Sequence, residues 1–153
     1  MRYRLLCVGR IRERYIADAA RDFAQRLRRY EPLEITEVPA TRGLDEARAR
    51  REEGDALLRR IVPGETVWLL ERTGNEFSSL DLVSRLKTLS ASGTSRLTLV
   101  VAGPYGASSN LLQRADFLWS LSQLTLLHEW ARALVLEQLY RAAKIVRREP
   151  YHH

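Results

Sequence analysis

Leu97-Thr-Leu-Val-Val-Ala102 followed directly by Gly103-Pro104-Tyr105-Gly106 is the stretch that decides the fold. The aliphatic and β-branched run predicts a strand buried on both faces, as in a parallel sheet. Gly103 lets a ligand approach the backbone closely, and Pro104 stiffens the turn. The loop is therefore either a plain tight turn or a set of backbone amides facing an adenosine or a carboxylate, and the residues alone leave both interpretations open.

Strands and helices alternate on both sides of this stretch. The patterns predict strands at 3–8, 33–38, 66–70, 97–102 and 117–121 and helices at 13–30, 44–61, 79–90, after 108 and at 129–148, with a loop at 73–75. Segment 33–38 alternates apolar and polar residues, which favours an edge strand, whereas 66–70 is continuously apolar and therefore central. This order predicts an α/β fold with a mostly parallel sheet flanked by helices.

Length and composition favour one domain spanning residues 1–153. The chain has 153 residues, of which 45% are hydrophobic and 29% charged, and no repeat or linker interrupts it. Its single cysteine, Cys7, lies in an apolar run, which predicts a buried thiol and suits a reducing compartment. No apolar run approaches the ~18 residues of a membrane span, and segment 5–8 is too short for a signal peptide. We therefore expect a cytoplasmic protein without a membrane partner.

Positive charge is concentrated at the two ends of the chain. The formal net charge is +6; residues 1–30 carry nine arginines and three acids, and residues 131–153 carry five bases and two acids. If the fold brings the two ends together, they form a patch suited to a nucleic-acid backbone. The alternative interpretation is that these side chains are ordinary solvated helix faces.

Several common site patterns are absent from the sequence. The first strand is followed by Gly9-Arg10-Ile11 instead of a dinucleotide-binding glycine motif, and neither a P-loop nor a nucleophile elbow occurs. The three histidines, His128, His152 and His153, have no zinc-ligand spacing with cysteines or carboxylates, so we expect no metal. The last two could equally be the remnant of a purification tag.

Ligands of open α/β sheets bind at the carboxyl ends of strands, which here follow Leu70, Ala102 and Leu121. Segment 122–127 is too apolar for an exposed loop, so it is either buried under other segments or lines an apolar pocket such as an adenine slot. His128 and Arg132 follow one helical turn apart, where they could present an anion-binding pair.

The C-terminal part of the chain resembles a known family. The matching motifs are Trp119-Ser-Leu-Ser122, Leu124-Thr125, His128, Arg132, Glu137-Gln-Leu-Tyr-Arg-Ala142 and Pro150-Tyr-His152. They are similar to the ribosomal RNA large subunit methyltransferase H family, a small bacterial group of SPOUT methyltransferases. The likeness extends over the whole chain and includes the Gly103–Gly106 loop.

The resemblance implies a SPOUT-type fold whose C-terminal part forms a trefoil knot, a homodimer, and S-adenosyl-L-methionine as methyl donor. It also implies methylation of N3 of a pseudouridine in 23S rRNA within the assembled ribosome. By the same resemblance the cofactor contacts fall on Leu70, Gly103, Ser122, Gln123, Leu124, Thr125, Leu126 and Leu127. The candidate catalytic residues are Arg132, His128, Tyr151 and His152, with Arg132 expected to stabilise an anion or a phosphate.

The sequence also departs from the family pattern at Ala102, Tyr105 and Leu127, where glycine, a small or acidic residue and proline are common in the family. These departures keep two alternatives open. One is a SPOUT-like methyltransferase that acts on another RNA such as tRNA, and the other is a non-catalytic dimeric module that binds RNA or ribosomes.

Overall fold

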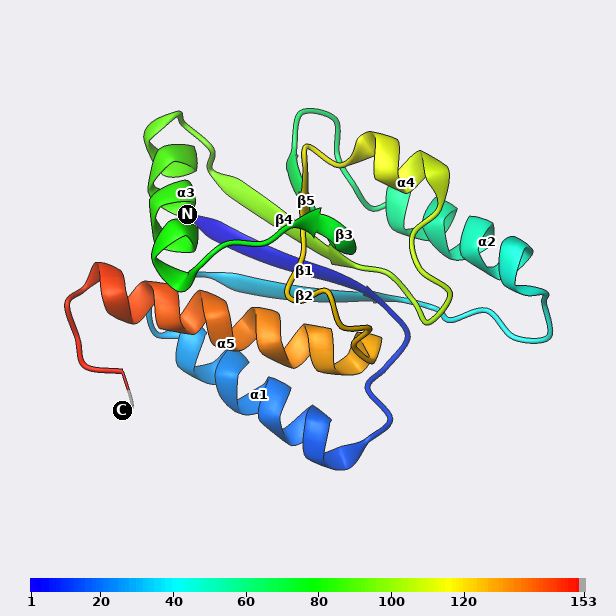
Figure 1. Ribbon diagram of the computed structural model, residues 1–153, viewed down its shortest axis with the longest axis horizontal. Helices are drawn as coiled ribbons and strands as arrows, with labels where there is room; N and C mark the ends of the chain where they lie inside the picture. The colour runs from blue at the N-terminus through cyan, green and yellow to red at the C-terminus, as the bar shows by residue number, and fades with distance from the viewer. Residues whose placement is uncertain (152–153) are drawn as a thin grey trace.

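Five parallel strands joined by helical crossovers make up the chain, which a computed structural model describes over residues 1–151 (Figure 1). The strands are β1 (Arg2–Val8), β2 (Leu33–Val38), β3 (Thr66–Asn75), β4 (Arg96–Val101) and β5 (Phe117–Trp119). The helices are α1 (Arg14–Arg28), α2 (Glu46–Leu58), α3 (Ser79–Ala91), α4 (Ser109–Arg114) and α5 (His128–Val146). The predicted alternation of strands and helices is confirmed.

All strand pairs are parallel, and the order across the sheet is β2-β1-β4-β3-β5. Helices α1, α3 and α5 cover one face of the sheet, and α2 and α4 cover the other (Figure 1). The predicted edge position of β2 and the central position of β4 are both confirmed. This arrangement is a three-layer, doubly wound α/β fold.

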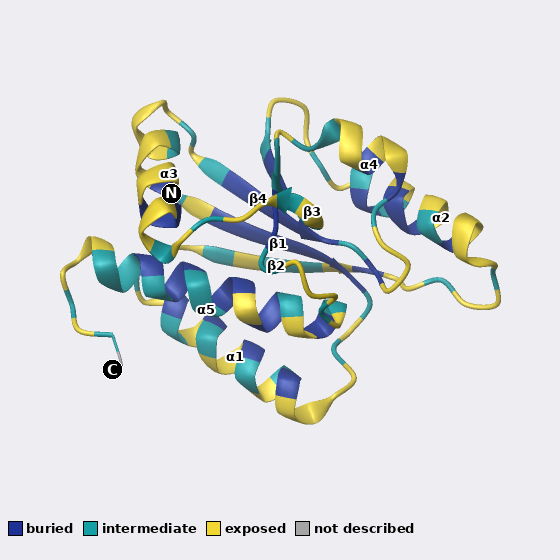
Figure 2. Cartoon of the chain, viewed as in Figure 1, coloured by how far each residue is buried: buried dark blue, intermediate teal, exposed yellow. Residues whose placement is uncertain are grey.

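Two hydrophobic cores follow from the alternation of side chains along the strands. Leu5 and Cys7 of β1 face the core under α1, α3 and α5, whereas Leu6 and Val8 face the core under α2 and α4. The buried residues accordingly form continuous bands along the central strands in Figure 2. The predicted burial of the Cys7 thiol is confirmed, since its side chain has no exposed surface.

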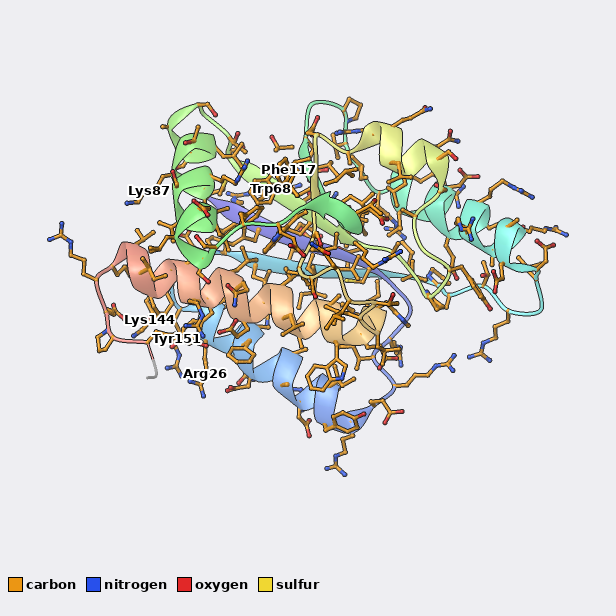
Figure 3. The ribbon with its side chains drawn as sticks, in the orientation of Figure 1. Arg26, Trp68, Lys87, Phe117, Lys144 and Tyr151 are labelled. Carbon is orange, nitrogen blue, oxygen red and sulfur yellow. The ribbon has the colours of Figure 1, made fainter. Side chains whose placement is uncertain are left out.

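An aromatic group fills the first core beside the outer strands. The rings of Trp68 and Phe117 lie 5.1 Å apart between centroids, and Phe77 stacks on Trp119 at 5.2 Å (Figure 3). Such ring pairs add to the stabilisation from burial alone. They hold the three-residue strand β5 against β3 at the edge of the sheet.

The end of β3 differs from its prediction as a loop at 73–75. The strand continues to Asn75, which pairs with Trp119 after a bulge that begins at Leu70, and its carbonyl oxygen accepts the N–H of Ser120 at 3.0 Å. Gly74 permits this pairing, because a Cβ there would lie 2.6 Å from the carbonyl oxygen of Leu118. The residue types at 73–75 predict a loop, but backbone pairing with β5 determines the conformation of this segment.

Helices α1 and α5 pack side by side, which brings the two basic ends of the chain together (Figure 1). Their contact includes the rings of Phe23 and Tyr140, with centroids 6.3 Å apart. A common basic surface requires the two ends of the chain to lie together, and this requirement is met.

Helix α2 packs closely against the beginning of α4. Ser108 caps α4 by accepting the N–H of Leu111, and it is buried against Gly54 of α2. A Cβ at Gly54 would lie 2.1 Å from the Ser108 hydroxyl oxygen and 2.7 Å from its Cβ. Glycine at this position therefore sets the distance between the two helices.

Replacing Gly54 by alanine should lower the free energy of unfolding by about 1–3 kcal/mol, because the added methyl group pushes α2 away from Ser108. Urea denaturation measures the change. In a Ser108→Gly background, Gly54→Ala should lower the free energy of unfolding much less. Glycine at position 108 removes the colliding atoms and remains acceptable as a helix cap. Equal costs in both backgrounds would contradict this packing argument.

Candidate functional site

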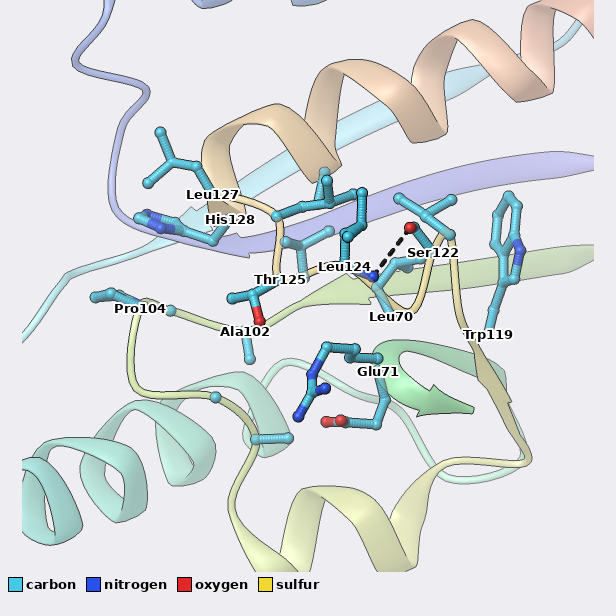
Figure 4. A pocket seen from close by; sticks show the side chains of 18 residues that line it. Leu70, Glu71, Ala102, Pro104, Trp119, Ser122, Leu124, Thr125, Leu127 and His128 are labelled. Carbon is cyan, nitrogen blue, oxygen red and sulfur yellow. Dashed lines mark hydrogen bonds between the residues drawn. The ribbon is translucent and has the colours of Figure 1, made fainter. Parts of the chain in front are cut away.

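A single cavity lies at the carboxyl ends of β3, β4 and β5, the three strand ends selected from the sequence. Its volume is about 530 Å³, within the range of small-molecule sites. The lining residues come from three segments of the chain: Leu70, Glu71, Arg72, Val101, Ala102, Gly103, Pro104, Gly106, Ala107, Trp119, Leu121, Ser122, Leu124, Thr125, Leu126, Leu127, His128 and Ala131. Figure 4 shows them around the opening. Segments far apart in sequence thus form one site.

Segment 122–127 forms one wall of the cavity, so the pocket-lining alternative is correct. The segment is held by short-range hydrogen bonds: the Leu124 N–H donates to the Ser122 hydroxyl at 3.0 Å, and the Ser120 hydroxyl donates to the Ser122 carbonyl oxygen at 3.0 Å (Figure 4). Gln123 does not line the cavity, and its amide donates to Glu76 at 3.5 Å. Leu124 remains 73% exposed, so part of this apolar wall faces the opening.

The Gly103–Gly106 loop forms the opposite wall. The Gly106 N–H donates to the carbonyl oxygen of Gly103 at 3.0 Å, and Gly106 has φ +83°, so the segment is a tight turn. The guanidinium of Arg50 on α2 donates to the carbonyl oxygen of Tyr105 at 2.7 Å. Ala102 lines the cavity, whereas Tyr105 does not. The two sequence interpretations of this loop are therefore compatible, because one turn serves as a cavity wall.

His128 is the titratable imidazole of the site and begins α5 at the cavity. Burial lowers its pKa below the ordinary value of 6.5, with a further lowering from Arg132 and Arg12, while the carboxylates of Glu129 and Glu53 oppose the shift. The imidazole is therefore neutral at pH 7. Its Nδ1 is buried and has no hydrogen-bond partner among residues 1–151.

Arg132 lies one helical turn further along α5 than His128 and does not line the cavity. Its side chain is 3% exposed; Nη1 donates to the carbonyl oxygen of Gly9 at 2.9 Å, and Nη2 pairs with Glu37. In the described chain His128 and Arg132 therefore do not form the anion-binding pair expected from their spacing. The guanidinium instead connects α5 to the ends of β1 and β2.

Tyr151 lies beside the second half of α5, near Lys144, with its ring centroid 5.5 Å from that of Tyr140 (Figure 3). Its hydroxyl donates to Glu137 at 2.6 Å, and the Arg141 guanidinium lies 3.8 Å from its ring centroid. Glu137 also pairs with Arg141 at 2.8 Å. Glu137 lies nine residues after His128, ~14 Å along α5, and Tyr151 does not line the cavity of its own chain. His152 lies outside the described residues.

Sequence reasoning missed Glu53, a glutamate of α2 that is buried directly behind the Gly103 wall. It is 3% exposed, and its Oε1 accepts the backbone N–H of Thr41 at 3.0 Å. One sequence signal could have found it, because Glu53 follows Ala49 and precedes Leu57 by four residues each, on the buried side of the helix.

Residues 1–151 contain no group of three or more histidine, cysteine or acidic side chains arranged to hold a metal ion. Within the same range no helix has the length and apolar character that crossing a bilayer requires.

A doubly wound parallel sheet with a cavity at the carboxyl ends of three neighbouring strands defines an α/β protein whose cavity lies where this class binds nucleotides. Comparison with known proteins specifies the class further. A family model described as "Predicted SPOUT methyltransferase" matches residues 1–152. The chain belongs to the SPOUT methyltransferase family.

Curated relatives cover the full length of the chain. The protein named ribosomal RNA large subunit methyltransferase H of Syntrophotalea carbinolica is 43% identical over 155 residues, covering 100% of this chain and 99% of its own. The protein of the same name from Pelobacter propionicus is 42% identical over 153 residues, with 100% coverage of both. A probable methyltransferase of Bordetella pertussis shares the fold with a TM-score of 0.57 at 15% identity, covering 93% of this chain and 96% of its own.

Replacing Arg132 by alanine should reduce the free energy of unfolding by about 2–4 kcal/mol, because it removes the partner of Glu37 and leaves the Gly9 carbonyl unsatisfied. Urea denaturation with circular dichroism measures this loss. Arg14→Ala is the matched control: its side chain is 95% exposed and lies 3.9 Å from Asp18, so little change is expected. Equal stability of the Arg132 variant and the wild type would contradict the structural role.

Proposed function

We propose that this protein transfers a methyl group from S-adenosyl-L-methionine to N3 of the pseudouridine at position 1915 of 23S rRNA in the assembled ribosome. The observation that carries the proposal is the convergence of Leu70, Gly103 and segment 122–127 on one cavity. Family membership supports methyl transfer, and the names of the relatives support the ribosomal RNA substrate.

The cavity fits this methyl donor in size and chemistry. Its walls are mostly aliphatic, as an adenine ring requires, and they include the backbone of Gly103 and the residues Ser122 and Thr125, which carry hydroxyl groups. The absent side chain of Gly103 leaves room for Glu53 behind this wall, because a Cβ there would lie 2.4 Å from Glu53 Oε2. When bound, the donor supplies a methyl group on a positively charged sulfur, and the protein contributes alignment and control of charge.

His128 is proposed to receive the proton that N3 of the pseudouridine must lose. A neutral imidazole can accept this proton on Nε2, whereas an imidazolium cannot. Burial keeps the pKa of His128 low, so the base form is present at neutral pH. Arg132 is proposed to act as a positioning residue: its bonds to Gly9 and Glu37 hold α5, and with it His128, against the sheet.

Tyr151 and His152 are proposed to contribute to the cavity of a second copy of the chain, in a homodimer. Tyr151 does not line the cavity of its own chain. An apolar surface on the first half of α5 supports pairing: Trp130 is 39% exposed and lies 5.9 Å from the ring of Tyr15, with Leu127 and Leu134 also exposed. The proposed protomer is one domain over 1–153 with the trefoil knot of its family, located in the cytoplasm.

Labelled methyl groups test the substrate. Ribosomes from a strain that lacks the modification should accept them from the purified protein, while isolated 23S rRNA should accept few and tRNA none. Recognition is proposed to depend on the shape of the assembled substrate. Transfer to tRNA would favour a different SPOUT substrate. Binding of ribosomes without transfer would favour the non-catalytic module, for which the Ala102 methyl group in the cavity wall is the specific argument.

The rate of methyl transfer should depend on pH through His128. Because burial lowers its pKa below 6.5, the rate should fall only when the pH drops through that lowered value and should stay constant up to neutral pH. His128→Asn should lose most of the transfer and the acidic limb of the pH profile. An unchanged acidic limb in the variant would assign the proton transfer to another group.

A further inference from the structure

The carboxylate of Glu53 is buried behind the cavity wall without a cationic partner. Its Oε1 accepts the backbone N–H and the hydroxyl of Thr41, at 3.0 and 2.9 Å. Its Oε2 is buried and has no hydrogen-bond partner within residues 1–151. None of the ion pairs of the described chain includes Glu53, and Arg50 of α2 donates to the carbonyl oxygen of Tyr105. A buried carboxylate usually has a partner, because removing its charge from water is costly.

This unpartnered oxygen lies against Gly103. A Cβ on Gly103 would be 2.4 Å from Oε2, so only glycine allows the carboxylate to approach the wall this closely. The charge is felt inside the cavity, since Glu53 is among the groups that raise the pKa of the cavity residue His128. The charged residues of the lining itself, Glu71 and Arg72, carry opposite signs. Arg132 and Arg12 act on the same imidazole with the opposite sign, but neither forms an ion pair with Glu53. Glu53 therefore places a negative charge without an ion-pair partner next to the cavity.

We infer that Glu53 is a specificity-determining residue, whose carboxylate acts through the Gly103 wall to favour a ligand with a positive charge in the cavity. This inference rests on the proposed function, in which that charge is the sulfonium of the methyl donor. Transfer moves the methyl group to N3 and leaves a neutral thioether, while the N3 proton leaves to the base. Once transfer has occurred, the thioether product no longer carries the positive charge that Glu53 attracts. The loss of this attraction promotes release of the product.

Calorimetric binding of S-adenosyl-L-methionine and S-adenosyl-L-homocysteine tests this inference, because the two ligands differ only in the methyl group and the charge on sulfur. Glu53→Gln keeps the size and the acceptor for Thr41 but removes the charge. It should weaken binding of the sulfonium ligand about tenfold, the order expected for two unit charges ~10 Å apart at an effective dielectric constant of ~20. Affinity for the neutral thioether should change less than about twofold on the same electrostatic argument.

Two further variants separate charge from structure. Thr41→Val removes one hydrogen bond to Glu53 and keeps the charge of Glu53. Any change in binding affinity should therefore be equal for both ligands. Glu53→Asp retains the charge and should retain the preference for the sulfonium ligand, even if its fold is less stable. Circular dichroism of each variant confirms that the compared proteins are folded.

Equal weakening of both ligands by Glu53→Gln would overturn the inference and leave Glu53 with a purely structural role. Loss of the preference in Thr41→Val would overturn it as well. Failure of the proposed function gives a different result, because the wild type would then bind neither ligand.

Discussion

Parallel pairing of β4 between β1 and β3 is the interaction on which the site depends. It places the carboxyl ends of β4, β3 and β5 next to one another, so that three loops distant in sequence meet at one cavity. The pairing is stabilised by burial on both faces, since Leu97, Leu99 and Val101 contribute to one core and Val100 to the other. The apolar composition that makes β4 a central strand is thus also what brings the cavity walls together.

Helix α2 supports the cavity from outside, although none of its residues lines it. Within two turns it contacts the Gly103–Ser108 segment at three places: Arg50 bonds to the Tyr105 carbonyl oxygen, Glu53 lies against Gly103, and Gly54 lies against Ser108. A loop that contacts a ligand must be held rigidly to be selective, and a rigid helix provides that support. The helix that looked least informative by sequence, being highly charged, therefore determines the shape and the electrostatics of one wall.

Most of the fold could be predicted from the sequence because local patterns and tertiary structure agree. The aliphatic run at 97–102 and the alternation at 33–38 each indicate the element that is observed. Helical spacing, however, could not show that Arg132 faces Glu37 while His128 faces the cavity, because that depends on how α5 sits on the sheet. The same limit applies to Glu53, whose importance depends on contacts with a loop that lies 50 residues further along the chain.

Cys7 gives the molecule an internal reporter. It is the only thiol of the chain, and it lies on β1 between β2 and β4, where burial raises its pKa to about 12. Alkylating reagents attack the thiolate, so the native protein should be inert to them. Labelling then requires the centre of the sheet to open, and its rate measures the stability of that opening without any engineered probe.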